Sequence, residues 1–422
     1  MPSDMPGDRA RATHLPFGVS FRLAYRNVLR HKARSMSILS AVLFGAMALV
    51  LSQGFVEDVF VQLAEAIVHS QTGHIQVAKG GYHAYGAHQP EKYVVGDPDG
   101  DKARIRSLPE VADVMARLSF SGVLNNGKAD VPIIGEGIEP DKEAALGTFL
   151  KIRAGRRLTD QDHFAALVGA GVAKDLQLAP GDRAVLMVST SDGAMNTLDV
   201  EVVGVFQSFS KDYDNRAIKI PLSAAQELLN TKGANTLVVS LKRTVDTAAV
   251  AGLLRERTVW RDQEVRTWDD LNDFYPKTVE MYRMQFGALR LIILLMVVLS
   301  VFNSVNSSVF ERTTEFGTAR ALGNRGSNVF RLVMLENSLL GVAGSVAGAV
   351  LAAVCAYGIS KVGIEMPPPP NTDLPYVAYI RVTWDAAASA IAISLGATLV
   401  AAVVPGVRVS RMDLPGALRS GS

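Results

Sequence analysis

The part of this sequence that most resembles a nucleotide-binding motif is the segment Gly122-Val-Leu-Asn-Asn-Gly127-Lys128-Ala129. It matches the first seven positions of a phosphate-binding P-loop, whose backbone amides and lysine contact phosphate groups. The eighth position should be Ser or Thr, which binds Mg²⁺, but here it is Ala129. In addition, Asn125-Asn126-Gly127 predicts a tight turn between two strands. We therefore reject a nucleotide site and expect this chain to bind no cofactor of its own.

Other catalytic chemistry is also poorly represented. The sequence has no His-Glu-x-x-His zinc-protease motif and no Gly-x-Ser-x-Gly elbow. Its single cysteine, Cys355, lies in an apolar run, which excludes a disulfide framework and a thiolate metal site. Four of the seven histidines lie within the segment His69–His88. We interpret this segment as a polar loop rather than as a metal site. We predict no catalytic residue and no metal ligand, and we do not expect an enzyme.

A different kind of activity is indicated by a short charged segment. Glu311 and Glu315 lie one helical turn apart. Arg312 and Arg320 lie eight residues apart, so each of the two pairs falls near one face of a helix. Gly323 is a suitable C-terminal stop for that helix. Because apolar runs lie on both sides, the helix must lie at the water interface, where a soluble protein can push it.

Four uncharged runs are long enough to span a bilayer, which needs roughly 20 residues. The chain has 422 residues, of which 48% are hydrophobic, and a mean hydropathy of +0.18. The four runs are Met36–Val56, Leu291–Phe310, Asn337–Ser360 and Ala386–Val407. More than 230 residues separate the first run from the second. The sequence therefore predicts an integral membrane protein with one large insertion.

Basic residues set the orientation of the spans. They cluster before the first span, between the second and third, and after the fourth. The loop 361–381 has only two basic residues, Lys361 and Arg381. The positive-inside rule places both termini and the 311–331 segment in the cytoplasm. Val19–Arg34 is amphipathic, with an arginine at every fourth position from Arg22, which suits a helix on the inner leaflet. We interpret the first span as retained, because it is longer than a signal-peptide core.

The predicted fold class is a membrane protein with four transmembrane α-helices and a large extracytoplasmic α+β domain inserted between helices 1 and 2. The predicted segments are a cytoplasmic N-terminus (1–35), spans at 36–56, 287–310, 328–360 and 384–407, the outer domain (57–286), a cytoplasmic coupling helix (311–327), a Pro-rich outer loop (361–383) and a cytoplasmic tail (408–422). In the outer domain, strands are predicted at 74–78, 111–124, 129–138, 184–189, 198–207, 236–241 and 264–268. A further strand that leads to a short helix is predicted at 165–178, and helices are predicted at 223–230 and 247–256.

Polar and small residues within the spans predict contacts between helices. In lipid, hydroxyl and amide groups face other helices, and glycines allow close approach. The residues concerned are Ser300, Asn303, Ser304 and Ser307 in the second span, and Gly341, Gly344 and Gly348 in the third. Glu336 is interpreted as the partner of an arginine in the 312–331 segment rather than as part of an ion path.

The segment Glu311-Arg312-x-x-Glu315-x-Gly317-x-x-Arg320-Ala321-x-Gly323 resembles the coupling-helix signature of the FtsX-like permeases. These are membrane subunits of ABC transporters, and they include lipoprotein-releasing and macrolide-exporter types. Ala24–Arg30 resembles the N-terminal amphipathic helix of the family, and Ser410–Arg419 resembles its C-terminal end. The four-span topology agrees, so the resemblance extends over essentially the whole chain.

The resemblance implies that two permease subunits, identical or paralogous, stand over two copies of a separate ABC ATPase, which binds ATP and Mg²⁺. Glu311, Arg312, Glu315, Gly317, Arg320, Ala321 and Gly323 would form the helix that docks on this ATPase. The protein would lie in the bacterial inner membrane, with its outer domain in the periplasm. Closure of the ATPase would be relayed through the spans to this outer domain, a mode of action called mechanotransmission. No nucleic-acid partner is expected, since the net charge is only +2.

The function is open to four interpretations. Macrolide exporters carry a fused N-terminal ATPase that this sequence lacks, so the resemblance favours extraction or release of a lipoprotein or another amphiphilic substrate. Export of peptides or macrolide-like molecules with a periplasmic adaptor is the first alternative. A non-transporting regulator of a cell-wall hydrolase is the second, and a receptor without an ATPase is the third.

Overall fold

The computed structural model describes residues 16–86, 90–190, 194–256, 262–367 and 376–412. The chain forms two compact units. One takes in the chain up to Val59, Glu280–Ile364 and the chain from Val377 onward, and it is helical. The other, which is the outer domain, consists mainly of Phe60–Val279 and contains a mixed sheet. This arrangement confirms the predicted fold class.

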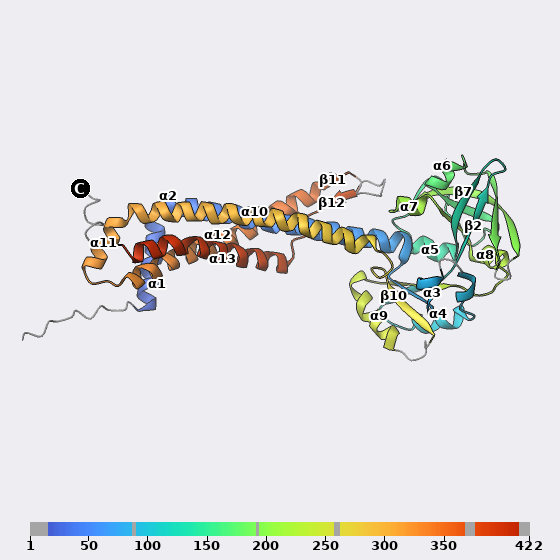
Figure 1. Cartoon of the computed structure of the whole chain (residues 1–422), viewed down its shortest axis with the longest axis horizontal. Coiled ribbons are helices and arrows are strands. Elements are labelled where there is room, and N and C mark those ends of the chain that lie inside the picture. Colours follow the sequence, from blue (N-terminus) through green and yellow to red (C-terminus); the bar gives the residue numbers. More distant parts are fainter. Residues whose placement is uncertain (1–15, 87–89, 191–193, 257–261, 368–375, 413–422) are drawn as a thin grey trace, which may run out of the picture. The chain divides into compact units, whose positions relative to one another are not determined.

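The helical unit contains four helices that are long and apolar enough to cross a membrane, counted over the described residues. They run alongside one another within this unit (Figure 1). These helices are α2 (Lys32–Ile67), α10 (Phe274–Glu311), α12 (Gly326–Val362) and α13 (Trp384–Ser410). The shorter helices α1 (Phe17–Arg30) and α11 (Thr313–Ala321) complete the unit. Thr383 caps α13 by accepting a hydrogen bond from the amide of Ala386, which satisfies one of the free N–H groups at that helix end.

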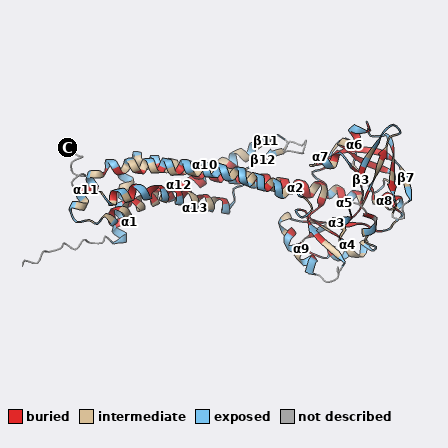
Figure 2. Cartoon of the chain, in the orientation of Figure 1, coloured by how far each residue is buried: buried red, intermediate tan, exposed pale blue. Residues whose placement is uncertain are grey.

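Glycines allow α12 to pack closely against two neighbours. A methyl group added at Gly348 would lie 2.4 Å from the carbonyl oxygen of Leu43 in α2. Gly344 likewise faces α2, whereas Gly341 faces Leu395 of α13. The buried residues of the helices lie on these facing surfaces, and the opposite surfaces are exposed (Figure 2). Backbones can approach this closely only where no side chain intervenes.

The Gly348→Ala substitution should therefore force α12 and α2 apart. Overpacking of this kind costs about 1–3 kcal/mol, and thermal unfolding of the permease in lipid nanodiscs would show it as a lower Tm. Gly358→Ala is the matched control, because no other segment comes within 4 Å of the added methyl group. Equal Tm values for the two variants would contradict this account of the packing.

The sheet of the outer domain is built on one long strand, whose two halves pair with different neighbours. Residues 111–117 of β2 (Val111–Asn125) pair with β9, and residues 118–125 pair with β3 and β6. The strand order is β10-β1-β9-β2-β3-β8-β5-β7-β4, and β6 pairs with β2 and β7. The other strands of this sheet are β1 (Ile75–Lys79), β3 (Asp130–Ile138), β4 (Lys151–Gly155), β5 (Ala165–Gly169), β6 (Arg183–Ser189), β7 (Met195–Gln207), β8 (Ala217–Pro221), β9 (Thr236–Leu241) and β10 (Gln263–Thr267), and β11 (Ile364–Met366) pairs with β12 (Tyr376–Ala378) in a separate sheet. The two halves of β2 thus belong to two lobes.

Each lobe has its own apolar core. One core contains Leu118, Phe120 and Ile218, and the other contains Val114, Val239 and Leu254. Over its described residues, the outer domain has seven α-helices: α3 (Tyr82–Tyr85), α4 (Pro98–Arg106), α5 (Pro140–Leu146), α6 (Ala170–Asp175), α7 (Lys211–Asp214), α8 (Leu222–Leu228) and α9 (Thr247–Glu256). A π-helical turn, η1 (Val68–Thr72), leads from α2 into β1.

The hairpin predicted at Asn125-Asn126-Gly127 is confirmed. β2 and β3 pair in antiparallel register with Asn125 opposite Asp130, and Gly127 has φ +83°. A positive φ favours glycine, which explains the residue at this turn. Residues 1–15, residues 191–193, residues 368–375 of the predicted Pro-rich loop (361–383) and the tail beyond Met412 lie outside the described residues.

Candidate functional site

Arg312 forms the centre of a polar contact that joins three helices. It lies between α10 and α11, and its side chain is 7% exposed. Its Nη1 atom donates to Oε2 of Glu336 in α12 at 2.8 Å, and Nδ2 of Asn27 in α1 donates to Oε1 of the same carboxylate at 2.6 Å. The partner predicted for Glu336 is therefore present, and it is Arg312. A buried charge needs such partners, because an unpaired one is costly.

The same arginine also fixes the start of α11. Its Nε atom donates to Oε2 of Glu315 at 3.1 Å, and its guanidinium carbon lies 4.7 Å from the centre of the Phe316 ring. At the other end, the amide of Gly323 donates to the carbonyl of Arg320, and the amide of Asn324 donates to the carbonyl of Ala319. This pair of bonds is a Schellman motif, and Gly323 has the positive φ of +93° that the motif requires.

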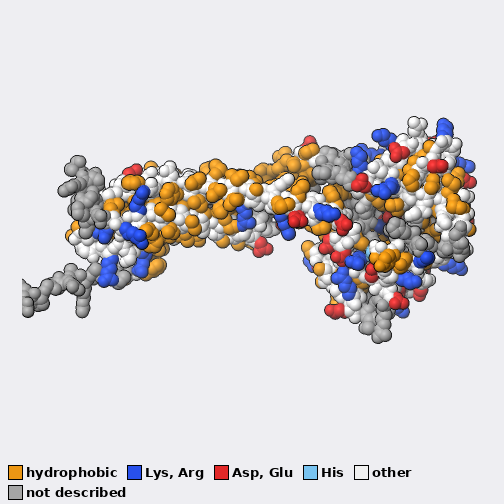
Figure 3. Space-filling view, in the orientation of Figure 1, with side chains coloured by type: hydrophobic (Ala, Val, Ile, Leu, Met, Phe, Trp, Pro, Cys, Tyr) orange, Lys and Arg blue, Asp and Glu red, His pale blue; other side chains and the backbone are white. Residues whose placement is uncertain are grey.

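The outward surface of α11 carries exposed residues that could bind a partner. Glu315 is half exposed and Leu322 is 85% exposed, and Ala321 and Gly323 are exposed beside them. Gly317 is buried on the opposite side. Lys and Arg side chains gather at this end of the helices, and apolar side chains cover the helices themselves (Figure 3).

Two further contacts tie the ends of these helices together. Arg34 of α2 forms an ion pair with Glu311. Arg320 donates from Nη1 to the carbonyl oxygen of Met412, just beyond α13. The structure thus places the seven residues of the predicted coupling helix in or beside α11, with Arg312 and Gly317 turned inward.

The polar residues predicted to face other helices are only partly paired within one chain. Ser304 lies 3.3 Å, oxygen to oxygen, from Ser37 of α2. Ser300, Asn303 and Ser307 lie on the exposed face of α10.

Sequence reasoning missed Asn27 and Phe316 as parts of this site. Asn27 lies 309 residues from Glu336 in the chain, so no local pattern connects the two. The apolar character of Phe316 within a charged segment was the one available signal.

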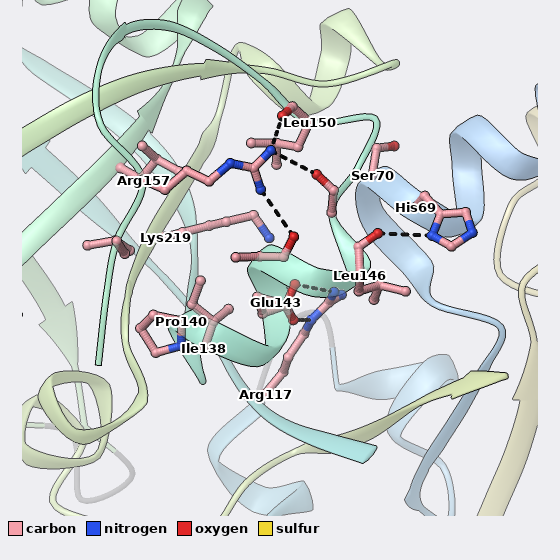
Figure 4. A pocket seen from close by; sticks show the side chains of 14 residues that line it. His69, Ser70, Arg117, Ile138, Pro140, Glu143, Leu146, Leu150, Arg157 and Lys219 are labelled. Atoms are coloured by element: carbon pink, nitrogen blue, oxygen red, sulfur yellow. Dashed lines mark hydrogen bonds and ion pairs between the residues drawn. The ribbon is translucent and has the colours of Figure 1, made fainter. Parts of the chain in front are cut away.

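A second group of buried charges lies in the outer domain, beside a pocket (Figure 4). Arg117 of β2 pairs with Glu143 of α5, with Nη2 2.9 Å from Oε2, and it also donates to the carbonyl of Gln71 in η1. Arg157 donates to the carbonyl oxygens of Gly147 and Leu150. Arg117 is the last β2 residue that pairs with β9, so this network lies where the two lobes meet.

Lys219 and Glu136 form the inner part of that network. Nζ of Lys219 lies 2.6 Å from Oε2 of Glu136, and the Tyr213 hydroxyl donates to the same oxygen at 2.9 Å. Burial by itself would raise the pKa of Glu136, but the charges of Lys219 and Arg117 and these hydrogen bonds lower it to about 2. These charges pair with one another inside the domain, so we assign them to its stability.

Comparison with known proteins adds two family matches. Residues 35–257 match the family model described as "MacB-like periplasmic core domain", and residues 287–414 match "FtsX-like permease C-terminal". The chain is 28% identical over 284 residues to the pyoverdine export ATP-binding/permease protein PvdT of Pseudomonas aeruginosa. This alignment covers 62% of this chain and 40% of PvdT. It is 22% identical over 366 residues to the macrolide export ATP-binding/permease protein MacB of Neisseria gonorrhoeae. That alignment covers 83% of this chain and 55% of the Neisseria protein.

The chain therefore spans about half the length of these curated relatives. Among solved structures, the periplasmic region of MacB from Actinobacillus actinomycetemcomitans aligns with 51% of this chain and 95% of its own length. The identity in that alignment is 17% and the TM-score is 0.36.

Proposed function

We propose that this chain transmits the movement of an ABC ATPase to its outer domain. It belongs to the FtsX-like permeases of ABC transporters and carries a MacB-like periplasmic core domain. The family predicted from the sequence is confirmed by those matches. The observation that carries the proposal is the buried contact of Arg312 with Glu336, which joins α11 to α12 and, through Asn27, to α1. A push on α11 would therefore move several helices together.

The ATPase is proposed to bind the exposed surface of α11 and to supply ATP and Mg²⁺ chemistry from a partner chain. Two features of the surface support this. Leu322 offers an apolar contact, and Glu315 offers a half-exposed charge beside it. An apolar anchor next to a charged rim is the usual composition of a protein interface.

A second permease subunit is proposed to pack on the exposed face of α10. Asn303 and two serines on that face would otherwise meet lipid, where unsatisfied polar groups are costly. A partner helix can accept and donate hydrogen bonds there. Two permease subunits, identical or paralogous, would then match two copies of the ATPase.

Export of an amphiphilic small molecule or peptide from the outer face of the membrane is the transport reaction that we place first. The relatives named above are a pyoverdine exporter and a macrolide exporter, and neither name concerns lipoproteins. Lipoprotein release, which the sequence alone favoured, becomes the second candidate. Regulation of a cell-wall hydrolase is the outcome expected if no transported substrate stimulates the ATPase.

ATP hydrolysis by the permease and its ATPase in lipid nanodiscs tests this function. We expect Glu315→Lys to reduce substrate-stimulated hydrolysis at least tenfold, which corresponds to a loss of about 1.4 kcal/mol of coupling free energy. The substitution reverses the charge at the proposed contact, and the new lysine repels Arg312. Glu256→Lys, at an exposed position of the outer domain, makes the same change of net charge and should have no effect.

The added substrate decides between the candidates. A macrolide or a siderophore that stimulates hydrolysis supports export, and a triacylated lipoprotein that does so supports lipoprotein release. If the ATPase neither binds nor responds to this permease, the coupling proposal is wrong.

A further inference from the structure

The outer end of α2 carries a glutamate and a histidine that bind each other one helical turn apart. Nε2 of His69, in the π-helical turn η1, lies 3.1 Å from Oε2 of Glu65. On the other side of the ring, Nδ1 lies 2.9 Å from the carbonyl oxygen of Leu146, the last residue of α5 (Figure 4). An ionised carboxylate and a carbonyl group can only accept hydrogen bonds. Both ring nitrogens must therefore carry a proton, which makes His69 an imidazolium cation.

A chain of hydrogen bonds on the other side fixes the ionised state of Glu65. Its Oε1 accepts from the Thr244 hydroxyl at 2.6 Å, so each carboxylate oxygen faces a donor. Oγ1 of Thr244 lies 3.2 Å from Nε2 of His74, whose Nδ1 accepts from the amide of Leu241 at 3.2 Å. Because the hydroxyl proton points to Glu65, Nε2 of His74 is the donor and His74 is neutral. Burial and the charge of His69 lower the pKa of His74 to about 4, in agreement with this state.

These hydrogen bonds join α2 to both lobes of the outer domain. The helix α5 follows β3, which pairs with the second half of β2. The 3₁₀ turn η3 (Thr244–Asp246) follows β9, which pairs with the first half. We call the contact of Glu65 and His69 with Leu146 and Thr244 the joint, since it connects the outer end of α2 to elements of two lobes.

Glu65 is the charged group in contact with the His69 ring. The neutral ring of His74 meets it edge-on, with ring centres 5.5 Å apart, and Asp246 of η3 pairs with Arg243. The other charged groups that line the pocket beside His69 are Arg117, Glu143, Arg157 and Lys219. Each of these four has a bonded partner inside the domain. The side chain of His69 is 23% exposed, so its proton exchanges with the solvent.

The contacts of His69 stabilise its charged form. The residue lies in the outer domain, beyond the predicted span 36–56. The hydrogen bond with Glu65 raises the pKa of His69 above its ordinary value of 6.5, burial opposes the rise, and the Leu146 carbonyl adds to it. The charge is therefore fully present below about pH 6.5, and it is lost as the pH rises through the raised pKa.

We infer that the joint depends on a proton: it fastens the outer end of α2 to α5 while His69 is an imidazolium, and it releases that bond when an alkaline medium removes the proton. A neutral ring has one N–H group, so it cannot donate to Glu65 and to Leu146 at once. Glu65 and His69 are thus positioning residues for the movement that α2 transmits. The inference deepens the proposed function, on which it rests, by adding a regulation by pH at the outer side.

The ionisation of His69 can be observed in the full permease. In lipid nanodiscs, the ring-nitrogen NMR signals of isotope-labelled histidine distinguish an imidazolium from the neutral forms, and the His69 signal is the one that His69→Gln removes. We expect it to titrate with a midpoint above pH 6.5, the ordinary value. In Glu65→Gln, which keeps the shape of the glutamate but not its charge, the midpoint should be lower.

Two results of that titration would overturn the inference. One is a wild-type midpoint at or below pH 6.5. The other is a set of histidine midpoints that Glu65→Gln leaves unchanged, and this comparison remains available if His69→Gln does not fold.

The effect on coupling is tested by ATP hydrolysis at about pH 6 and about pH 9, with and without a stimulating substrate. The ratio of stimulated to basal hydrolysis corrects for the pH dependence of basal hydrolysis. We expect the wild-type ratio to fall about fivefold at the higher pH, the low end of coupling between sites. His69→Gln does not titrate, so its ratio should be low at both pH values.

His163→Gln is the matched control for this experiment. His163 is exposed in the outer domain, so this variant should follow the wild type at both pH values. A ratio for His69→Gln that matches the wild type at the lower pH and falls as far at the higher pH would contradict the inference.

The two proposals fail in different ways. If no substrate stimulates hydrolysis in the wild-type complex, the proposed function fails, but the midpoint of the His69 signal still reports whether the joint holds a proton.

Discussion

Glu336→Ala is expected to destabilise the permease by about 3–5 kcal/mol and to uncouple the ATPase, because it removes the buried partner of Arg312. Arg312 would keep only Glu315, whose side chain is half exposed. The side-chain amide of Asn27 would also lose its acceptor, so α1 would be held less firmly against α12. Thermal unfolding in nanodiscs measures the first effect, and stimulated ATP hydrolysis measures the second.

A double-mutant cycle separates the ion pair from its surroundings. Arg312→Leu with Glu336→Leu removes both charges, so it should be more stable than either single variant. Stimulated hydrolysis should stay low in the double variant, since α11 is no longer fixed to α12. Single variants as stable as the wild type would show that the buried pair does not hold these helices.

The second large effect is expected in the outer domain, from Lys219→Met. Lys219 is 3% exposed, so its loss leaves the buried carboxylate of Glu136 without its closest cation. Removing one member of a buried pair costs about 3–5 kcal/mol. The exposed Lys174, changed to Met in the same way, is the control and should leave the unfolding temperature unchanged.

The pH dependence of this effect has a definite sign. The pKa of Glu136 is lowered to about 2 in the folded protein, from an ordinary value of 4.5. Its contribution to stability is therefore present above about pH 4.5 and is lost as the pH falls toward 2. In Lys219→Met that carboxylate loses the lysine, so the decrease between pH 5 and pH 3 should be smaller than in the wild type. An unchanged pH profile would contradict the assigned role of the pair.

Local sequence patterns were enough to predict much of the fold. The apolar runs located the four spanning helices, and the strands β2, β3 and β9 lie within one or two residues of the predicted ranges. The predicted helix 247–256 coincides with α9. Each of these elements has an apolar period or a turn residue that needs no knowledge of distant contacts.

Elements stabilised by distant partners were missed. β8 reads Ala-Ile-Lys-Ile-Pro and is buried throughout, but the central Lys219 breaks the apolar pattern unless Glu136 is known to face it. β4 is largely exposed and carries two charged residues, so it has no apolar signal at all.

The candidate site divides in the same way. The sequence predicted the charged helix and its glycine stop, and it predicted an arginine partner for Glu336. It could not show that Arg312 is that partner or that Asn27 joins the pair, since these contacts depend on how three helices pack. The function of α11 as the ATPase contact stays a prediction.

Crosslinking from Leu322 tests the central claim most directly. Leu322 is 85% exposed at the end of α11, so a photoreactive amino acid at this position should not disturb the fold. In membranes that contain the permease and its ATPase, we predict a crosslink between the two proteins, and no crosslink from the exposed position Val245 of the outer domain. Absence of any crosslink from Leu322, in a complex that nevertheless hydrolyses ATP under permease control, would show that movement enters the permease elsewhere.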